Sequence, residues 1–175
     1  MDRLTGLALA ASAGDRAALA SFVELSQADV WRFCCYLVGR EAADDAAQET
    51  FERAIGALGS FRGEASARTW LLAIARRTCV DVVRRLVRRR SLWDRMASRS
   101  TERAQPLGGT AEVDAVLALL DDTQRQAFVL TQLLGLSYQE ASEVCGCPIG
   151  TIRSRVGRAR EVLIAALGEV ESADG

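Results

Sequence analysis

Arginine and hydroxyl side chains gather near the end of the chain, within residues 149–160. Apolar residues recur there at helical spacing and share one helix face: Ile149, Ile152, Val156, Ala159 and Leu163. The other face and its flanks carry Thr151, Arg153, Ser154, Arg155, Gly157 and Arg158. Guanidinium and hydroxyl groups donate to phosphates and base edges, which is the chemistry of a helix inserted into the major groove of DNA.

The preceding residues supply the element that positions this helix. Ser137 and Glu140 form an S-x-x-E capping box, which predicts that a helix begins there. Gly146 and Pro148 then interrupt the pattern, and proline favours the first turn of a helix. The pattern predicts a helix-turn-helix whose second helix begins at or just after Pro148. An ordinary amphipathic helix with solvated arginines is the alternative that the motif leaves open.

Composition excludes several other chemistries. The 175 residues contain no histidine, which removes histidine-based acid–base catalysis and histidine metal ligands. The five cysteines include an adjacent pair and a lone C-x-C in different halves of the chain, so we expect free buried thiols rather than a zinc site. We expect no cofactor and no small-molecule substrate. No signal peptide and no apolar run approaching ~20 residues is found, which predicts a cytoplasmic protein without membrane insertion.

The net charge of −1 conceals a strongly uneven distribution. Residues 61–103 hold twelve arginines and four acidic residues, and residues 151–160 hold four more arginines. The remainder of the chain is acidic. Two basic surfaces in an acidic protein indicate contact with a polyanion, because local charge rather than total charge steers such partners.

Helical spacing is expected from Asp15 to Val38, and two further long helices follow it in the first half of the chain. One, over residues 41–58, carries acids and glutamine opposite its apolar side, and a solvated face is the simplest interpretation of them. The other, over residues 66–90 with Ser66 as its expected cap, carries many arginines and only Asp81 against them. Because like charges on one face repel, we expect a phosphate backbone to supply the missing negative charge.

Polar residues with Pro106, Gly108 and Gly109 predict a flexible linker at 91–110. One short helix is expected over 112–120, and a second, capped by Asp121 or Asp122, is expected to end at Gly135. The fold class is therefore all-α, with two small helical domains joined by that linker. We place the domains at 12–90 and 111–170, the second containing the helix-turn-helix.

Three segments in this order resemble one known family. They are DDAAQETFERA (44–54), FRGEASARTWLLAIARRTCVDVVRR (61–85) and LTQLLGLSYQEASEVCGCPIGTIRSRVGRARE (130–161). They are similar to the extracytoplasmic-function (ECF) sigma factors of bacterial RNA polymerase. The resemblance covers nearly the whole chain and implies sigma region 2 in the first domain and region 4 in the second.

The resemblance also implies roles for individual residues. The polymerase-binding positions would be Asp44, Asp45, Gln48 and Glu49. The positions that contact the promoter −10 element would be Arg62, Arg76, Arg77, Arg84 and Arg85, within the segment 61–90. The positions that contact the −35 element would be Thr151, Arg153, Ser154, Arg155 and Arg158, within 148–161. Family members often have asparagine at the position of Arg77 and some have a bulkier residue at that of Gly157, so base contact at Arg77 and the role of Gly157 stay open.

The resulting hypothesis is an initiation factor, not an enzyme, that binds core RNA polymerase and promoter DNA. Members of the family are often held inactive by an anti-sigma factor, which is frequently membrane-bound. Two other classes stay open: a stand-alone helix-turn-helix regulator, usually a dimer, and a decoy that holds polymerase without opening promoters. The first would leave the basic segment and the acidic helix unexplained.

Overall fold

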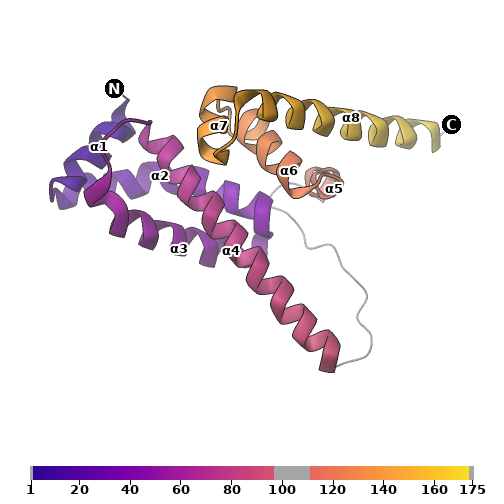
Figure 1. Cartoon of the computed structure of the whole chain (residues 1–175), viewed down its shortest axis with the longest axis horizontal. Coiled ribbons are helices and arrows are strands. Elements are labelled where there is room, and N and C mark those ends of the chain that lie inside the picture. Colours follow the sequence, from indigo (N-terminus) through magenta and orange to yellow (C-terminus); the bar gives the residue numbers. More distant parts are fainter. Residues whose placement is uncertain (1, 97–110, 174–175) are drawn as a thin grey trace.

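The computed structural model describes residues 2–96 and 111–173, with side chains over 2–89 and 113–166. Every regular element in these ranges is helical (Figure 1). The N-terminal group comprises α1 (Arg3–Ser12), α2 (Arg16–Val38), α3 (Arg40–Ala57), the short η1 (Leu58–Ser60) and α4 (Ala67–Met96). The C-terminal group comprises α5 (Ala111–Ala118), α6 (Asp122–Phe128), η2 (Val129–Leu133), α7 (Tyr138–Cys145) and α8 (Ile149–Ala173). The all-α prediction is confirmed.

Local signals explain where the N-terminal helices begin and turn. The Asp15 carboxylate accepts from the amides of Ala17 and Ala18 and caps α2. Gly39 alone separates α2 from α3, with φ of 84°, a conformation that favours glycine. Ser66 Oγ accepts from the amide of Thr69, which confirms the predicted cap of α4.

Helix α1 belongs to this group, although the sequence placed the start of the domain at residue 12. Thr5 Oγ1 accepts from the amide of Ala67 (2.9 Å), so α1 satisfies a free donor at the start of α4. Ala8 is fully buried in the shared core, together with Phe22 and Phe33 of α2 and Leu71 of α4. The packed unit therefore begins near Arg3.

Helix α4 is described as far as Met96, so it extends at least six residues beyond the predicted boundary at residue 90. Residues 91–96 hold neither glycine nor proline, and leucine, arginine and methionine favour helix. The predicted linker thus begins later than expected. Its remainder, residues 97–110, lies outside the described residues.

In the C-terminal group, Asp121 accepts from the amides of Thr123 and Gln124 and caps α6, as predicted. The last turn before Gly135 widens into a π-helix, η2, in which the Leu134 amide donates to the carbonyl of Val129 (2.9 Å). The buried side chains of Leu130, Ile152 and Val156 form the core of this group.

The two groups pack against each other along α4 and α7 (Figure 1). Arg68 Nη2 donates to the carbonyl of Leu134 (2.7 Å), and Arg76 Nε donates to Gln126 Oε1 (2.7 Å). The residue pattern predicted that these arginines face outward. Two donors of α4 are instead used within the protein.

The five cysteines are free thiols, four of them buried, as expected. Cys34 and Cys79 approach to 3.6 Å between sulfur atoms in the core of the N-terminal group. Burial raises the pKa of Cys35 and Cys145 to about 11, which disfavours the reactive thiolate. Among the described residues no cluster of three or more metal-ligating side chains occurs. None of the described helices combines the length and apolar character that crossing a bilayer demands.

Candidate nucleic-acid interface

The helix-turn-helix forms where the sequence predicts it. The Ser137 amide donates to Glu140 Oε2 (2.8 Å) and the Glu140 amide donates to Ser137 Oγ (3.2 Å), which completes the capping box. Gly146 ends α7 in the left-handed conformation, with φ of 62°. Helix α8 begins at Ile149, directly after Pro148. The turn therefore sets the direction of α8.

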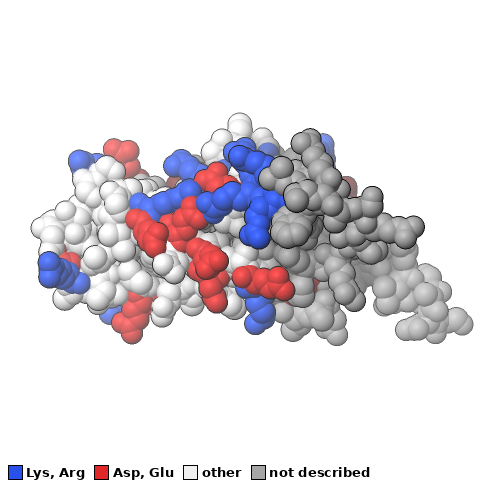
Figure 2. All heavy atoms as spheres, turned by 90° about the horizontal axis from the view of Figure 1, so that it is seen from below, with Lys and Arg blue, Asp and Glu red and all other residues white. Residues whose placement is uncertain are grey.

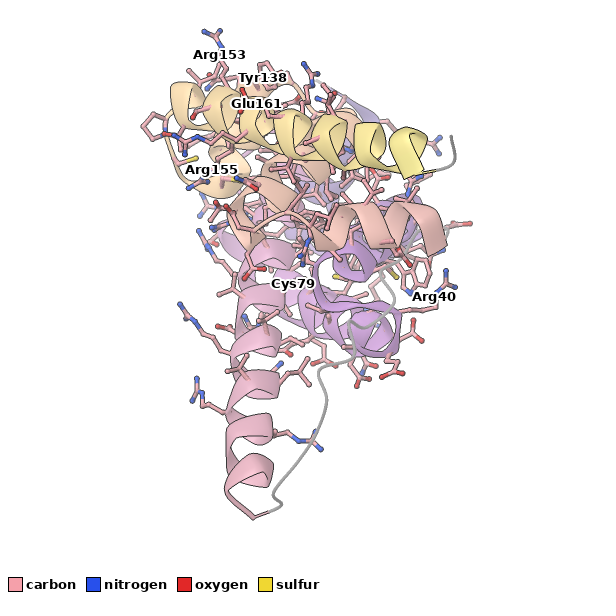
Figure 3. All side chains as sticks on the ribbon, turned by 90° about the vertical axis from the view of Figure 1, so that its right-hand side faces the viewer. Arg40, Cys79, Tyr138, Arg153, Arg155 and Glu161 are labelled. Carbon is pink, nitrogen blue, oxygen red and sulfur yellow. The ribbon has the colours of Figure 1, made fainter. Side chains whose placement is uncertain are left out.

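The outer side of α8 carries donors that have no acceptor within the described part of the chain. Ile152 and Val156 are buried on its inner side, whereas Arg153, Ser154 and Arg158 are exposed. No acceptor for these three side chains is found among the described residues. Figure 3 shows Arg153 projecting away from α8. These side chains are free to meet an external acceptor.

A surface hollow of about 470 Å³ lies beside these donors. Thr151, Ser154, Arg155 and Arg158 of α8 line it from one side. The start of α6 lines the other side with three residues that were not expected to contact DNA: Asp121, Thr123 and Gln124. The start of α6 and helix α8 come together only in the folded chain. The distance between them along the sequence could not predict this contact.

Arg155 differs from Arg158, although both line this hollow. Arg155 is half-buried, and its Nη1 lies 3.6 Å from Cys147 Sγ. It also lies near the Asp121 carboxylate, whose pKa is lowered mainly by the Gln124 amide and further by Arg155. Arg155 thus contacts neighbours within the domain, whereas the Arg158 side chain is exposed to solvent.

The arginines of α4 divide into two classes. Arg77 and Arg84 are exposed, and the described residues offer them no acceptor, as the sequence predicted. Arg76 is held by Gln126, and Arg85 is held by Glu49 at 2.6 Å. The expectation that the whole series lacks negative partners is therefore wrong for Arg85, because α3 supplies a carboxylate 36 positions away.

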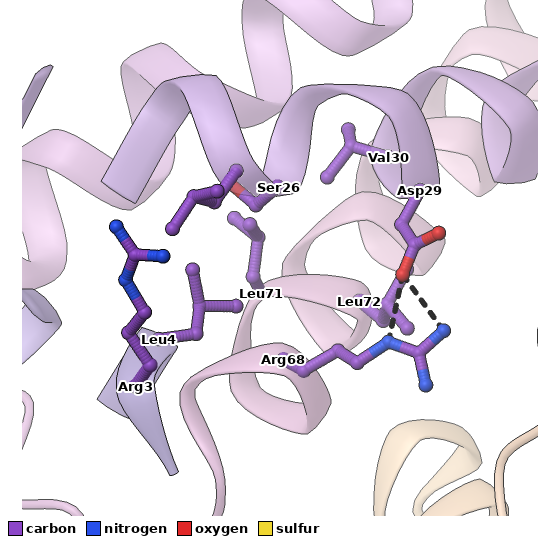
Figure 4. A pocket seen from close by; sticks show the side chains of 9 residues that line it. Arg3, Leu4, Ser26, Asp29, Val30, Arg68, Leu71 and Leu72 are labelled. Atoms are coloured by element: carbon purple, nitrogen blue, oxygen red, sulfur yellow. Dashed lines mark hydrogen bonds and ion pairs between the residues drawn. The ribbon is translucent and has the colours of Figure 1, made fainter. Parts of the chain in front are cut away.

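Arg68 marks one end of a smaller hollow, of about 190 Å³, between α1, α2 and α4 (Figure 4). Its Nε donates to Asp29 Oδ2 (2.7 Å), while Leu4, Leu71 and Leu72 form apolar walls. Arg3 stands at the other end (Figure 4).

The loop before α4 holds Arg62 and Phe61. Arg62 is exposed, and its Nη1 donates to the carbonyl of Gly59 (2.8 Å). The Phe61 ring is buried against Trp70, with centroids 4.9 Å apart. Trp70 thus packs against the core, and Arg62 keeps further donors for an outside partner.

The acidic residues of α3 have different environments. Asp44 accepts from Trp31 Nε1 (2.7 Å), and Gln48 donates to Glu52 (2.9 Å). Asp45 is exposed, and no partner for it occurs among the described side chains. Seen from below the molecule, acidic and basic side chains adjoin on one face (Figure 2). The acids therefore form a mixed surface rather than a purely negative one.

Comparisons with known proteins identify the family to which the chain belongs. Residues 22–89 match the model of Sigma-70 region 2, and residues 110–163 match that of Sigma-70 region 4. The chain is 49% identical over 176 residues to the ECF RNA polymerase sigma factor SigC of Mycobacterium tuberculosis (strain CDC 1551 / Oshkosh), covering 94% of this chain and 91% of that protein. The chain belongs to the ECF sigma factors. The family predicted from the three segments is confirmed.

Two solved structures share the fold. The chain resembles CnrH, solved in complex with the cytosolic domain of CnrY, with a TM-score of 0.75, 27% identity and coverage of 96% of this chain and 99% of CnrH. It also resembles the sigma factor RpoE of Bartonella quintana, solved with the anti-sigma factor NepR, with a TM-score of 0.71 and 28% identity. That match covers 85% of this chain and 96% of RpoE. An ECF sigma factor directs core RNA polymerase to promoters, and its regions 2 and 4 bind the −10 and −35 elements.

Proposed function

We propose that the outer side of α8 reads the promoter −35 element. The supporting observation is the set of exposed donors without an acceptor among the described residues: Arg153, Ser154 and Arg158. A guanidinium can bond two acceptors of one guanine edge, so Arg153 and Arg158 are assigned to bases. Thr151 and Arg155, which are half-buried beside the hollow, are assigned to phosphates.

The N-terminal group is assigned to the −10 element. Exposed Arg62, Arg77 and Arg84 have donors available for phosphates of an opened strand. Arg76 and Arg85 join them once their contacts with Gln126 and Glu49 are released. The domain assignment follows from this division: region 2 from α1 to α4, and region 4 from α5 to α8.

The acidic side of α3 is assigned to core polymerase. Asp44, Asp45, Gln48 and Glu49 lie along this helix, and Asp45 is the carboxylate most open to a basic partner. Polymerase supplies the nucleotidyl-transfer chemistry, so the chain itself acts as a binding factor and not as an enzyme. Its place of action is the nucleoid in the cytoplasm.

A regulatory partner belongs to the same proposal. The RpoE relative is solved with an anti-sigma factor, and CnrH with a cytosolic domain of another protein. We assign this chain an anti-sigma partner that blocks polymerase binding. Co-purification of the tagged chain from its own cells, followed by an inhibition test with the captured protein, identifies such a partner.

Transcription with purified core polymerase tests the function. Template fragments from the chain's own genome are transcribed with and without the chain, and transcript starts are mapped. Specific starts that require the chain are expected. A stand-alone regulator would instead bind duplex sites without polymerase, and a decoy would bind polymerase without producing starts. Either result would overturn the proposal.

A further inference from the structure

Four charged residues form a continuous network between α3 and α4. Arg85 donates twice to the carboxylate of Glu49, at 2.6 and 3.4 Å. Arg53 bonds the same carboxylate through Nη2 (2.5 Å) and reaches Asp81 Oδ2 through Nη1 (2.9 Å). The hydrogen bond from Arg85 is the main cause that lowers the pKa of Glu49. This carboxylate is thus charged and engaged from two sides.

The two ends of the Glu49–Arg85 pair are assigned to different macromolecules. Under the proposed function, on which this inference rests, Glu49 meets polymerase and Arg85 meets the promoter phosphates. Both side chains are partly exposed, at 26% for Glu49 and 53% for Arg85, so each is open to its ligand. However, the guanidinium fork of Arg85 is directed at Glu49, so it cannot engage a phosphate fully while the pair persists.

We propose that Glu49 is a positioning residue that holds Arg85 on α3 until a basic residue of polymerase engages the carboxylate. The released guanidinium then binds a phosphate of the promoter. Each ligand on its own must break the same ion pair, whereas the second ligand finds it already broken. Polymerase binding and DNA binding therefore strengthen each other, and linkage requires that this effect be reciprocal.

Exposure sets the size of the effect. Exposed ion pairs are weak, so the pair changes either affinity by about two- to five-fold rather than by orders of magnitude. Arg53 remains bonded to Glu49 after Arg85 leaves. The carboxylate therefore keeps its position on α3 for the polymerase contact.

The first test measures how the isolated full chain binds fluorescein-labelled oligo(dT) at low salt, by anisotropy. Glu49→Gln is expected to raise the affinity about two- to five-fold. Glu52→Gln is the matched control, since it removes the same charge from α3 while its side chain contacts Gln48 and not Arg85. The gain must vanish in the Glu49→Gln/Arg85→Ala double variant. A gain that Glu52→Gln reproduces, or that survives in the double variant, overturns the proposal.

The second test measures the reciprocal effect on core polymerase without DNA. Arg85→Ala is expected to raise the affinity of the chain for polymerase by about the same two- to five-fold. Arg89→Ala, which removes an exposed arginine one turn along α4, leaves it unchanged. In a Glu49→Gln background Arg85→Ala must have no effect, and an effect there overturns the coupling. If the wild-type chain still supports promoter-specific transcription in that case, the proposed function stands and only the coupling fails.

Discussion

Arg158 and Arg160 lie two residues apart on α8, and both are exposed, but their environments differ. Arg160 Nη2 donates to Gln132 Oε1 (2.9 Å), whereas Arg158 lines the open hollow beside α6. Helical periodicity predicted the outer face correctly, because it depends only on residue spacing. Periodicity could not show that Gln132 lies within reach of Arg160, since that contact depends on how α8 packs against η2.

Arg158→Ala is expected to weaken holoenzyme binding to its own promoter by about 1–3 kcal/mol, because a bidentate base contact is lost. Binding is measured on duplexes that carry single-base changes in the −35 element. The loss should shrink on the variant base pair that Arg158 reads. Arg160→Ala is the control and should change affinity little. An equal loss on every sequence would show that Arg158 contacts only phosphate.

Asp45→Arg is expected to lower the affinity for core polymerase by tenfold or more, about 1.4 kcal/mol, because it places like charges together in the interface. Asp45 is exposed, so circular dichroism and the thermal midpoint should remain those of the wild type. Glu24→Arg makes the same charge change at an exposed position of α2 and serves as the control. Unchanged polymerase binding would show that the acids of α3 are only a solvated face.

At the scale of elements, local signals predicted most helix starts. The caps at Ser66, Asp121 and Ser137 form as expected, because each needs only residues two or three positions away. The π-turn of η2 and the length of α4 were not predicted. Residues 91–96 hold polar and charged side chains that suggested a linker although none of them stops a helix, and η2 gives no distinctive sequence pattern.

The cap of α6 gives a pH-dependent prediction. Hydrogen bonds from backbone amides, mainly that of Gln124, lower the pKa of Asp121. The charged form of this carboxylate therefore stabilises the folded state. That contribution is complete above the ordinary aspartate pKa of about 3.9 and is lost as the pH falls through the lowered value. Asp121→Ala should therefore cost about 1 kcal/mol at neutral pH, and less at low pH.

Hydrogen exchange of the α6 amides measures this effect. Asp121→Asn keeps an oxygen acceptor and should retain protection at neutral pH, while losing the acid-dependent part. Protection in Asp121→Ala equal to that of the wild type at neutral pH would mean that the cap contributes nothing to α6.

At the scale of the whole molecule, one arginine that the family resemblance assigned to DNA lies in the contact between the two helical groups. Arg76 of α4 bonds Gln126 of α6 across the contact, 50 positions away in the chain. Gln126 is buried, and Cys145 of α7 lies close enough for Arg76 to affect its pKa. Residue spacing cannot predict a contact between separate domains. Arg76 was therefore expected to be exposed. For Arg76 Nε to bind promoter phosphate, its bond to Gln126 must break.

Gln126→Ala is expected to loosen this docking, because the half-buried guanidinium of Arg76 loses its acceptor, at a cost on the order of 1 kcal/mol. Small-angle scattering of the free chain should give a larger radius of gyration than that of the wild type. Gln132→Ala removes an exposed glutamine that contacts Arg160 within the C-terminal group, so it should leave the radius unchanged. A radius that Gln126→Ala does not alter would show that the packing of α7 on α4, with the Arg68–Leu134 hydrogen bond, holds the groups together without this bond. Release of Arg76 would then require a partner that parts the helices themselves.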